Sequence, residues 1–436
     1  MSADPAVLEY AEPKRPLAIP SQRTEEDNAR LPRRAVDFGW RFHAKPIRLL
    51  PDSSLSLFPV RQRATAALLT QYCADGNSLT SCLQCGACTV NCHLAETDGL
   101  LFPRRQMSLL QLGEVDKLLV DPAVWLCFNC ADCTSGCPAE AGPGRVMAAI
   151  RRLAVERYSV PRGWGRWANQ PLGFLSVLLA AIALLLVAIA MGGSFSPQAS
   201  PVRYASMLPH FTVNLFFGAV AGMVMIAAAI GAARAWRAFT GEALWMARVG
   251  RLLRSVGSVA RQIATHQQFS ECRQFPLSRW AHISLSYGFL TLLALAGVAA
   301  VRIAVHAPYP LPASHPLKIA GNLAAALMIG GGLYFWVQRQ RESRKSGSSS
   351  WFDWALLVEL LLVGTTGVLA EVFRYANIAA LAYPTYFLHL AFVFVLLAGA
   401  AHSKLAHVFY RTVALTAEEY QAAASVPGLE PGRVAA

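Results

Sequence analysis

Charged residues are scarce in this sequence, and they are unevenly spread. Only 15% of its 436 residues are charged, whereas 54% are hydrophobic. The first 167 residues hold 20 Lys and Arg against 17 Asp and Glu, and the remainder holds 19 against 9 with long uncharged runs between them. Such apolar runs exclude a purely soluble globular protein, and the high hydrophobicity excludes a disordered chain.

Signals for secretion and for nucleotide binding are missing as well. The stretch MSADPAVLEYAEPKRP has no basic start followed by an apolar segment, so no secretory signal is expected. The sequence has neither a GxGxxG fingerprint nor a Walker loop, so chemistry with a flavin or ATP would belong to another polypeptide. Residues 1–60 show no apolar periodicity and predict an extended arm.

Six apolar segments occupy the second half, each long enough for a helix to cross a hydrocarbon core of roughly 30 Å. One such segment alone would also suit a helix buried in a large soluble protein. Six in succession, with short polar joins, favour a membrane bundle. The predicted spans are 172–191, 211–233, 282–301, 319–337, 354–373 and 386–407.

The Lys and Arg residues of the joins predict the orientation of the bundle. Basic residues crowd the joins at 234–279 and 339–345. The other joins carry only Arg203, Arg302, Lys318 and Arg374. The N-terminal domain and the C-terminus are therefore expected on the cytoplasmic side of a bacterial inner membrane. Topology and anionic lipid account for the basic excess, so no nucleic-acid partner is expected. Residues 242–264 predict an amphipathic helix on the inner membrane surface.

Cysteine is concentrated in one part of the chain, where nine of the ten Cys lie between Cys73 and Cys137. Without a secretory signal, such a density indicates metal binding rather than disulfides. Eight of the nine form two motifs of identical spacing. The motifs are Cys82-x2-Cys85-x2-Cys88-x3-Cys92 and Cys127-x2-Cys130-x2-Cys133-x3-Cys137-Pro138.

This spacing is typical of a ferredoxin with two 4Fe–4S clusters, in which the fourth Cys of each motif serves the other cluster. Zinc is the alternative, although zinc sites more often use Cys pairs. The predicted ligand sets are Cys82, Cys85, Cys88 and Cys137 for cluster 1, and Cys127, Cys130, Cys133 and Cys92 for cluster 2. Cys73 fits neither motif and is expected to be an ordinary thiol, and no role is assigned to Cys272.

Two His residues in the last predicted span would share one helix face. His389 and His407 are 18 residues apart, which is about five whole turns and about 27 Å along the axis. Two His ligands at opposite depths are what two stacked haems across a bilayer require. His402 would point elsewhere, rotated by about 220° from His389, and is expected to be a packing residue.

Each haem iron needs a second axial ligand at the same depth. His282 begins the third predicted span on the inner side and suits His407. On the outer side His210 is favoured as the partner of His389, with His315 and then His306 as alternatives.

The predicted fold is therefore all-α. A helical, ferredoxin-like domain with two 4Fe–4S clusters would occupy 61–167, because LLQLGEVDKLLV and RVMAAIRRLAVERY both have helical periodicity. A six-helix transmembrane bundle with two b haems would follow over 168–411, and a cytoplasmic tail over 412–436.

With these features in place, residues 75–415 resemble the C subunit of the quinone-interacting membrane-bound oxidoreductase complex. That polypeptide fuses a domain similar to the C subunit of heterodisulfide reductase to a haem b domain similar to the E subunit of the same enzyme. The segments that carry the resemblance are the two Cys motifs, FPRRQM, DPAVWLCFNCADC, PGRVMAAIR, HQQFSEC, RWAHISLSYGF and HSKLAHVFYR. The last span also resembles the γ subunit of respiratory nitrate reductase, where both partner ligands lie ten residues apart on one helix. Here the residue ten after His282 is Leu292.

The resemblance implies electron exchange between a quinone pool and cytoplasmic flavin and iron–sulfur subunits that serve adenylylsulfate reductase in sulfur metabolism. One alternative is a membrane anchor or conduit for another soluble dehydrogenase, of the tricarballylate-utilisation type. Another is a heterodisulfide reductase-like complex, although the sequence lacks the CCG motifs of a disulfide-reducing polypeptide.

Quinone chemistry would also require a proton acceptor near a haem. Glu359 and His266 are the candidates, although a Glu in an apolar helix is more often satisfied by a neighbouring helix.

Overall fold

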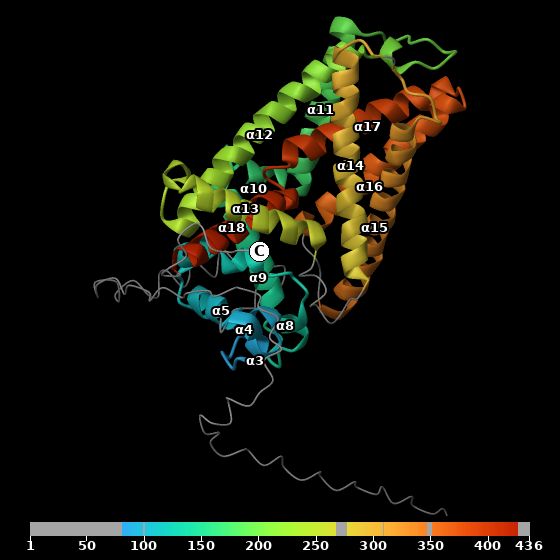
Figure 1. Cartoon of the computed structure of the whole chain (residues 1–436). Helices are drawn as coiled ribbons and strands as arrows, with labels where there is room; N and C mark the ends of the chain where they lie inside the picture. The colour runs from blue at the N-terminus through green and yellow to red at the C-terminus, as the bar shows by residue number, and fades with distance from the viewer. Residues whose placement is uncertain (1–80, 99–100, 267–276, 308, 347–350, 426–436) are drawn as a thin grey trace, which may run out of the picture. The chain divides into compact units, whose positions relative to one another are not determined.

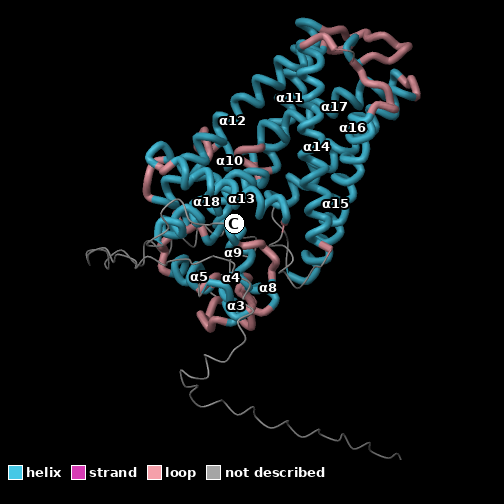
Figure 2. The backbone as a smooth tube through the Cα atoms, viewed as in Figure 1, coloured by secondary structure: helices cyan, strands magenta, loops and turns pink. Residues whose placement is uncertain are grey.

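The computed structural model describes residues 81–98, 101–266, 277–307, 309–346 and 351–425. All described residues belong to one compact unit. The predicted arm, Cys73 and Cys272 lie outside the described residues. Within these ranges the chain forms helices joined by loops and turns, without a strand (Figures 1 and 2), so the all-α prediction is confirmed.

The cysteine-rich part consists of short helices around one longer helix. They are α3 (Ala87–Val90), α4 (His93–Asp98), α5 (Arg104–Gln111), α6 (Val115–Leu119), α7 (Ala123–Leu126), α8 (Asp132–Ser135) and α9 (Pro143–Tyr158). Helix α9 begins with Pro143, which suits the first turn because its missing N–H would have no helical partner there. The periodic stretch LLQLGEVDKLLV forms two helices rather than one, because Gly113 adopts a left-handed φ of 77° between α5 and α6.

Among the residues that the structure describes, six helices are long and apolar enough to cross a membrane. They are α11 (Pro171–Gly192), α12 (His210–Thr240), α14 (Ser278–Ala304), α15 (Pro316–Ser346), α16 (Trp351–Tyr375) and α17 (Ala379–Gly399). Large apolar side chains remain exposed along them, including Leu172 at 78% and Met191 at 84%. Contact with lipid would cover these side chains, which agrees with a multi-pass membrane protein.

The last predicted span is wrong in one respect. The sequence predicts one helix over 386–407, but α17 already ends at Gly399, and a short turn η5 (Lys404–Ala406) precedes α18 (His407–Ser425). Asn169 donates a hydrogen bond to the carbonyl of His402, and the His402 ring bonds the carbonyl of Val160. These long-range bonds hold the backbone at His402 outside a helix. His389 and His407 therefore do not share a continuous helix, and the residues predicted as a tail from 412 continue α18.

Helix α13 (Val249–Thr265) and the turn before it form an amphipathic surface. Exposed apolar side chains gather there, among them Trp245 at 86%, Val249 at 68% and Leu253 at 65%. Such an element suits the plane of a membrane surface, as the pattern of 242–264 predicts.

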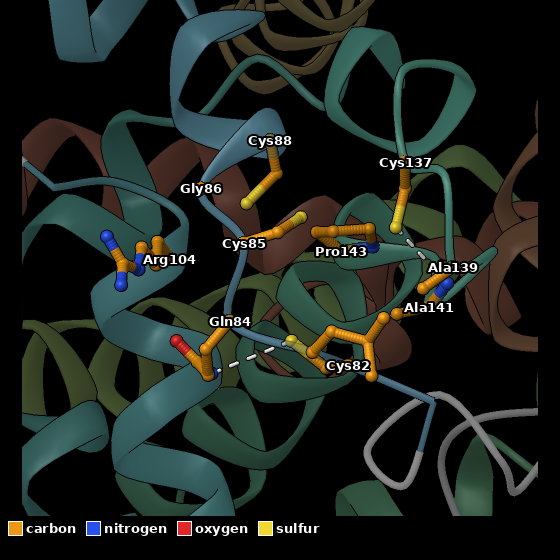
Figure 3. Close-up of a pocket in the computed structure, with 11 residues that line it drawn as sticks. Cys82, Gln84, Cys85, Gly86, Cys88, Arg104, Cys137, Ala139, Ala141 and Pro143 are labelled. Atoms are coloured by element: carbon orange, nitrogen blue, oxygen red, sulfur yellow. Dashed lines mark hydrogen bonds between the residues drawn. The ribbon is translucent and has the colours of Figure 1, made fainter.

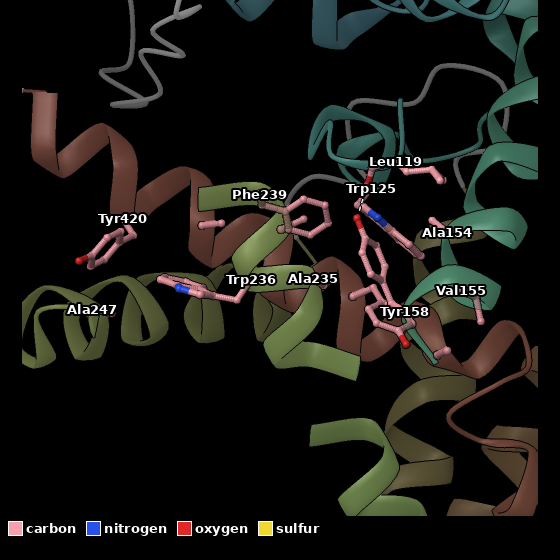
Figure 4. Packing of buried hydrophobic residues seen from close by; sticks show 14 residues of the cluster. Leu119, Trp125, Ala154, Val155, Tyr158, Ala235, Trp236, Phe239, Ala247 and Tyr420 are labelled. Carbon is pink, nitrogen blue, oxygen red and sulfur yellow. Dashed lines mark hydrogen bonds between the residues drawn. The ribbon is translucent and has the colours of Figure 1, made fainter. Parts of the chain in front are cut away.

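One buried cluster ties the cysteine-rich part to the long helices. The Tyr410 ring of α18 lies 5.3 Å from that of Trp125 on α7 and 5.7 Å from that of Tyr158 on α9. Figure 4 shows Trp125 and Tyr158 close to Phe239 of α12, and the Tyr158 hydroxyl donates to the carbonyl of Leu119. Helices α7, α9, α12 and α18 therefore share a single core.

Replacement of Tyr410 should weaken this junction. Tyr410 is 2% exposed, and truncation of a buried aromatic side chain costs about 3–5 kcal/mol. We expect Tyr410→Ala to lower the unfolding temperature of the detergent-solubilised protein by several degrees, measured by circular dichroism. The control is Tyr375→Ala, whose side chain is 49% exposed, and it should change stability by less than about 0.5 kcal/mol. Equal effects of the two substitutions would refute the role of this cluster.

Candidate metal centres

Four thiols surround one pocket in the cysteine-rich part. Figure 3 shows the side chains of Cys82, Cys85 and Cys88 turned toward that of Cys137, which comes from the second motif. Gly86, with a left-handed φ of 85°, turns the chain between Cys85 and Cys88 into α3. Cys88 is buried, whereas Cys85 is exposed. The pocket therefore has an open side at Cys85.

The other four thiols form a second group. Cys92 interacts electrostatically with Cys127 and Cys130, and Cys133 interacts with all three of them. The backbone N–H of Asn129 donates to the Cys127 sulfur at 3.4 Å, and in the first group that of Ala141 donates to the Cys137 sulfur at 3.4 Å. Hydrogen bonds of this kind stabilise thiolate ligands. The structure thus brings the eight thiols together in the two crossed sets that the sequence predicts.

A close approach of the two motifs produces this crossing. A Cβ atom added to Gly136 would lie 2.3 Å from the Asn91 side-chain nitrogen, so only glycine fits at Gly136 while Asn91 keeps its position. Gly136 precedes Cys137 and Asn91 precedes Cys92. The contact therefore places the fourth Cys of each motif beside the three closely spaced Cys of the other.

The donor sets fit iron–sulfur clusters. In a 4Fe–4S cluster each thiolate binds a different iron, so the four sulfurs stand apart around the cluster. Among the described residues, no group of three or more His, Cys, Asp or Glu is arranged for a single metal ion. Burial raises the pKa of the Cys92 thiol to about 12, and burial likewise raises the pKa of Cys88. Cluster binding therefore has to release protons from these thiols.

Two of the predicted haem ligands, His407 and His389, share one hydrogen-bond arrangement. The Nδ1 atom of His407 lies 2.7 Å from the carbonyl of Lys404, and that of His389 lies 3.1 Å from the carbonyl of Val363. A carbonyl only accepts, so Nδ1 carries the proton and Nε2 keeps a free lone pair. In His282, Nδ1 lies 3.2 Å from the Ser286 hydroxyl and 3.1 Å from Nε2 of His266. Metal-binding His side chains commonly have this arrangement.

The two inner His ligands lie in the same region. His282 interacts electrostatically with His407 and with Arg411. Leu405, two residues before His407, packs in one cluster with Leu285, three residues after His282. The structure thus brings together the pair that the sequence predicts for the inner haem.

On the outer side, two observations bear on the predicted choice between His210 and His315. Helices α12 and α17 pack together through the stacked rings of Phe216 and Phe394, 5.5 Å apart. His210 lies six residues before Phe216, and His389 lies five residues before Phe394. If α12 and α17 run in the same direction across the membrane, the two His residues therefore lie at a similar depth. His315 accepts a hydrogen bond from the Leu317 N–H at Nδ1, so the proton of its neutral ring sits on Nε2 and blocks that atom as a ligand.

Two further His residues, His402 and His266, have other partners. The Nε2 atom of His402 lies 2.8 Å from the Val160 carbonyl, so this ring donates from Nε2 and is turned away from the haem-ligand arrangement. His266 contacts the predicted ligand His282 at 3.1 Å. Glu359 lines a different pocket, together with His402. A role of Glu359 or His266 in quinone chemistry therefore stays a prediction.

Arg411 joins the second thiol group to the helix of His407, and the sequence prediction assigned it no role. Its guanidinium donates to the carbonyls of Trp125, Leu126 and Cys127 at 2.8–3.1 Å. Arg411 is one turn after His407 on α18. The sequence does draw attention to Arg411, because this residue ends the segment HSKLAHVFYR. Its hydrogen-bond partner Cys127, however, lies 284 residues earlier in the chain.

Comparison with known proteins identifies the N-terminal region. A family model described as 4Fe-4S dicluster domain matches residues 78–141. A protein of Archaeoglobus profundus, described as like the C subunit of heterodisulfide reductase, is 42% identical over 82 residues, which are 19% of this chain and 44% of that protein. The C subunit of the H(2):CoB-CoM heterodisulfide,ferredoxin reductase of Methanothermobacter thermautotrophicus is 37% identical over 86 residues, with the same coverage.

The likeness is confined to the cysteine-rich region. The chain spans less than half the length of these curated relatives. No solved structure matches the chain. Residues 78–141 therefore form an iron–sulfur domain that resembles the C subunit of heterodisulfide reductase, and six apolar helices follow it.

The metal content tests the ligand sets. Two clusters with four thiolates each should give about eight non-haem irons per chain. Cys85→Ser and Cys130→Ser should each abolish the electron paramagnetic resonance signal of one cluster and leave the other, because these residues belong to different sets. Cys73→Ser, outside both motifs, is the control and should keep all the iron. Stoichiometric zinc with little iron would contradict the assignment.

Proposed function

We propose that this protein carries electrons between membrane quinone and soluble flavin and iron–sulfur subunits, through two 4Fe–4S clusters and two b haems. The iron–sulfur domain and its relatives support an electron-transfer role. The quinone and the haems rest on the membrane helices and on the His arrangement described above. Haem b takes up and gives back one electron at a time when it is bound.

The observation that carries this proposal is the bond network of Arg411. The carbonyl of Cys127, a ligand of cluster 2, accepts from Arg411, and Arg411 interacts electrostatically with His407 and His282. Cluster 2 and the inner haem site are thus fixed to the same short segment of α18. This geometry supports cluster 2 as the centre that exchanges electrons with the membrane domain.

Cluster 1 is the centre on the side of the soluble partners. Cys85 is exposed, and the neighbouring Leu83 and Val90 are 75% and 78% exposed. An exposed cluster edge with apolar side chains beside it suits transient docking of a redox partner. The proposed route runs from soluble subunits to cluster 1, cluster 2, the inner haem at His282 and His407, and the second haem at His389 and His210.

The orientation follows from the basic residues. Arg residues are frequent in the segment before α14 and in the last turns of α15, at the end of the bundle where the iron–sulfur domain packs. The positive-inside rule then places this domain in the cytoplasm of a bacterial cell, with the bundle in the inner membrane.

The soluble partner is proposed from the resemblance alone. Subunits linked to adenylylsulfate reductase are the first candidate. The names of the curated relatives favour a second, a heterodisulfide reductase-like complex in which this chain supplies the electron conduit. Neither role requires catalysis of disulfide chemistry by this chain.

Haem counts test the four axial ligands. We expect two haems per wild-type chain in a pyridine haemochrome assay. His407→Ala and His282→Ala should each leave one haem with the same spectrum, since both supply the inner iron, and His389→Ala should remove the other haem. His402→Ala should remove no haem, because the Nε2 atom of His402 donates a hydrogen bond to the Val160 carbonyl. One haem in the wild type would contradict the His389 site.

The same variants test the proposed function. Menadiol, a reduced naphthoquinone, should reduce the clusters of the wild-type protein in nanodiscs, because the haems connect the quinone to cluster 2. We expect His407→Ala to slow the reduction of the clusters by menadiol about tenfold or more. Dithionite should still reduce the clusters of this variant. If menadiol reduces the clusters of His407→Ala as fast as those of the wild type, the inner haem is not on the route.

The charge of Arg411 should set the potential of cluster 2. A nearby positive charge stabilises an added electron, so Arg411→Gln should lower the reduction potential of cluster 2 and leave that of cluster 1 unchanged. Arg411→Lys keeps the positive charge and should shift the reduction potential of cluster 2 less than Arg411→Gln does. Redox titration followed by electron paramagnetic resonance measures both potentials, and the exposed Arg254, changed to Gln, is the control. Equal shifts in both clusters would refute the contact as the cause.

A further inference from the structure

A pocket lies where α10 (Trp164–Ala168), α11, α16 and α17 meet. Aromatic and aliphatic side chains form most of its lining, including those of Trp164, Phe174 and Phe352. Two ionisable side chains, Glu359 and His402, also line it. Ligand sites in proteins have this composition, an apolar wall with few polar groups that orient the ligand.

Both ionisable side chains have a buried atom without a hydrogen-bond partner. Glu359 is 5% exposed and His402 is 4% exposed. The Oε1 atom of Glu359 and the Nδ1 atom of His402 make no hydrogen bond. A buried polar atom without a partner costs about 1–3 kcal/mol, so such a pair in one pocket points to a ligand that supplies the missing bonds.

The hydrogen-bond capacity of His402 follows from its other nitrogen. Nε2 donates to the carbonyl of Val160, 2.8 Å away, so Nδ1 of the neutral ring carries a lone pair. Burial lowers the pKa of His402, which favours this neutral form. Asn169, which donates to the His402 carbonyl, fixes the backbone of the same residue. His402 therefore offers an acceptor to the pocket.

In the orientation proposed above, this pocket lies at the depth of the inner membrane surface. The exposed rings of Trp164 and Trp167 on α10 are 5.1 Å apart, and such aromatic pairs are common at the interface of a membrane. Asp353, one turn and a half before Glu359, forms an ion pair with Lys404 at 2.7 Å. A molecule dissolved in the bilayer could present a polar ring at this depth while its apolar tail stays in lipid.

We propose that this pocket binds the quinone ring, with Glu359 and His402 as the groups that exchange protons with its two oxygens. The inference rests on the proposed function and adds the binding site and a residue, His402, to it. When a quinol is oxidised, one O–H proton passes to His402 Nδ1 and the other to the Glu359 carboxylate. The two electrons leave for the iron–sulfur chain, and the quinone remains. Quinone reduction is the reverse, with two electrons and two protons taken up.

The test uses the full chain with its iron and haem in nanodiscs, and menadiol as the electron donor. Glu359→Gln keeps the shape of the side chain but cannot exchange the proton. In His402→Gln the amide N–H can still donate to Val160, but the acceptor at Nδ1 is lost. Ala355→Leu fills the pocket without changing a polar group. The control is Glu371→Gln, at the other end of α16, where Glu371 pairs with Lys318 at 2.5 Å.

We expect Glu359→Gln and His402→Gln to slow cluster reduction by menadiol about tenfold or more, since proton transfer by a positioned group contributes about 10²–10⁴-fold. Ala355→Leu should raise the menadiol concentration that gives half the maximal rate. Glu371→Gln should stay within about twofold of wild type. Iron and haem contents, and complete reduction by dithionite, should be unchanged in all four.

The failures are distinguishable. If menadiol does not reduce the wild-type clusters, the proposed function falls and the pocket assignment with it. If menadiol reduces the wild type and all three pocket variants equally fast, only the pocket assignment is overturned. If Glu359→Gln and His402→Gln lose haem or iron, Ala355→Leu decides the question. A higher menadiol concentration at half the maximal rate supports the site, and an unchanged concentration refutes it.

Discussion

The arrangement of the redox centres depends on how the backbone carbonyls at the end of α7 are satisfied. The last carbonyls of a helix have no partner within it and need donors from elsewhere. Here two arginines from different helices supply them: Arg151 of α9 bonds the carbonyls of Val124 and Cys127, and Arg411 of α18 bonds those of Trp125, Leu126 and Cys127. Because charge-assisted hydrogen bonds are about twice as strong as neutral ones, this contact fixes cluster 2 against α18.

The same constraint explains why the chain breaks between α17 and α18. A helix continued from α17 would carry Arg411 away from α7, since its direction would stay that of α17. The turn at His402 and Ser403 lets α18 take another direction, along α7 and α12. Ser403 caps the new turn by accepting a hydrogen bond from the Leu405 N–H. The break thus serves both the junction of the iron–sulfur domain and the placement of His407.

Local patterns were sufficient for much of this structure, and long-range contacts decided the rest. The spacing of the eight Cys residues predicts the two crossed sets, because that spacing reflects the geometry of a cluster and not the surrounding fold. Apolar runs predict the start of five of the six spans within four residues, although α12 and α15 continue seven and nine residues beyond the predicted ends. The end of α17 was mispredicted because the segment LLAGAAHSKLAH contains no proline, and the bond that interrupts it comes from Asn169, 233 residues earlier. The partner of Arg411 was equally beyond local inference.

Tautomers, rather than helix faces, separate the His residues by function. His407 and His389 were selected from a spacing that presumes one continuous helix, and that presumption fails. Both nevertheless bond a carbonyl through Nδ1, which leaves Nε2 free as a metal ligand requires. His402 bonds its carbonyl through Nε2, its Nδ1 atom has no hydrogen-bond partner, and the residue lines the pocket that holds Glu359. The choice of hydrogen-bonded nitrogen therefore supports both proposals, His402 for proton exchange and His389 and His407 for haem iron.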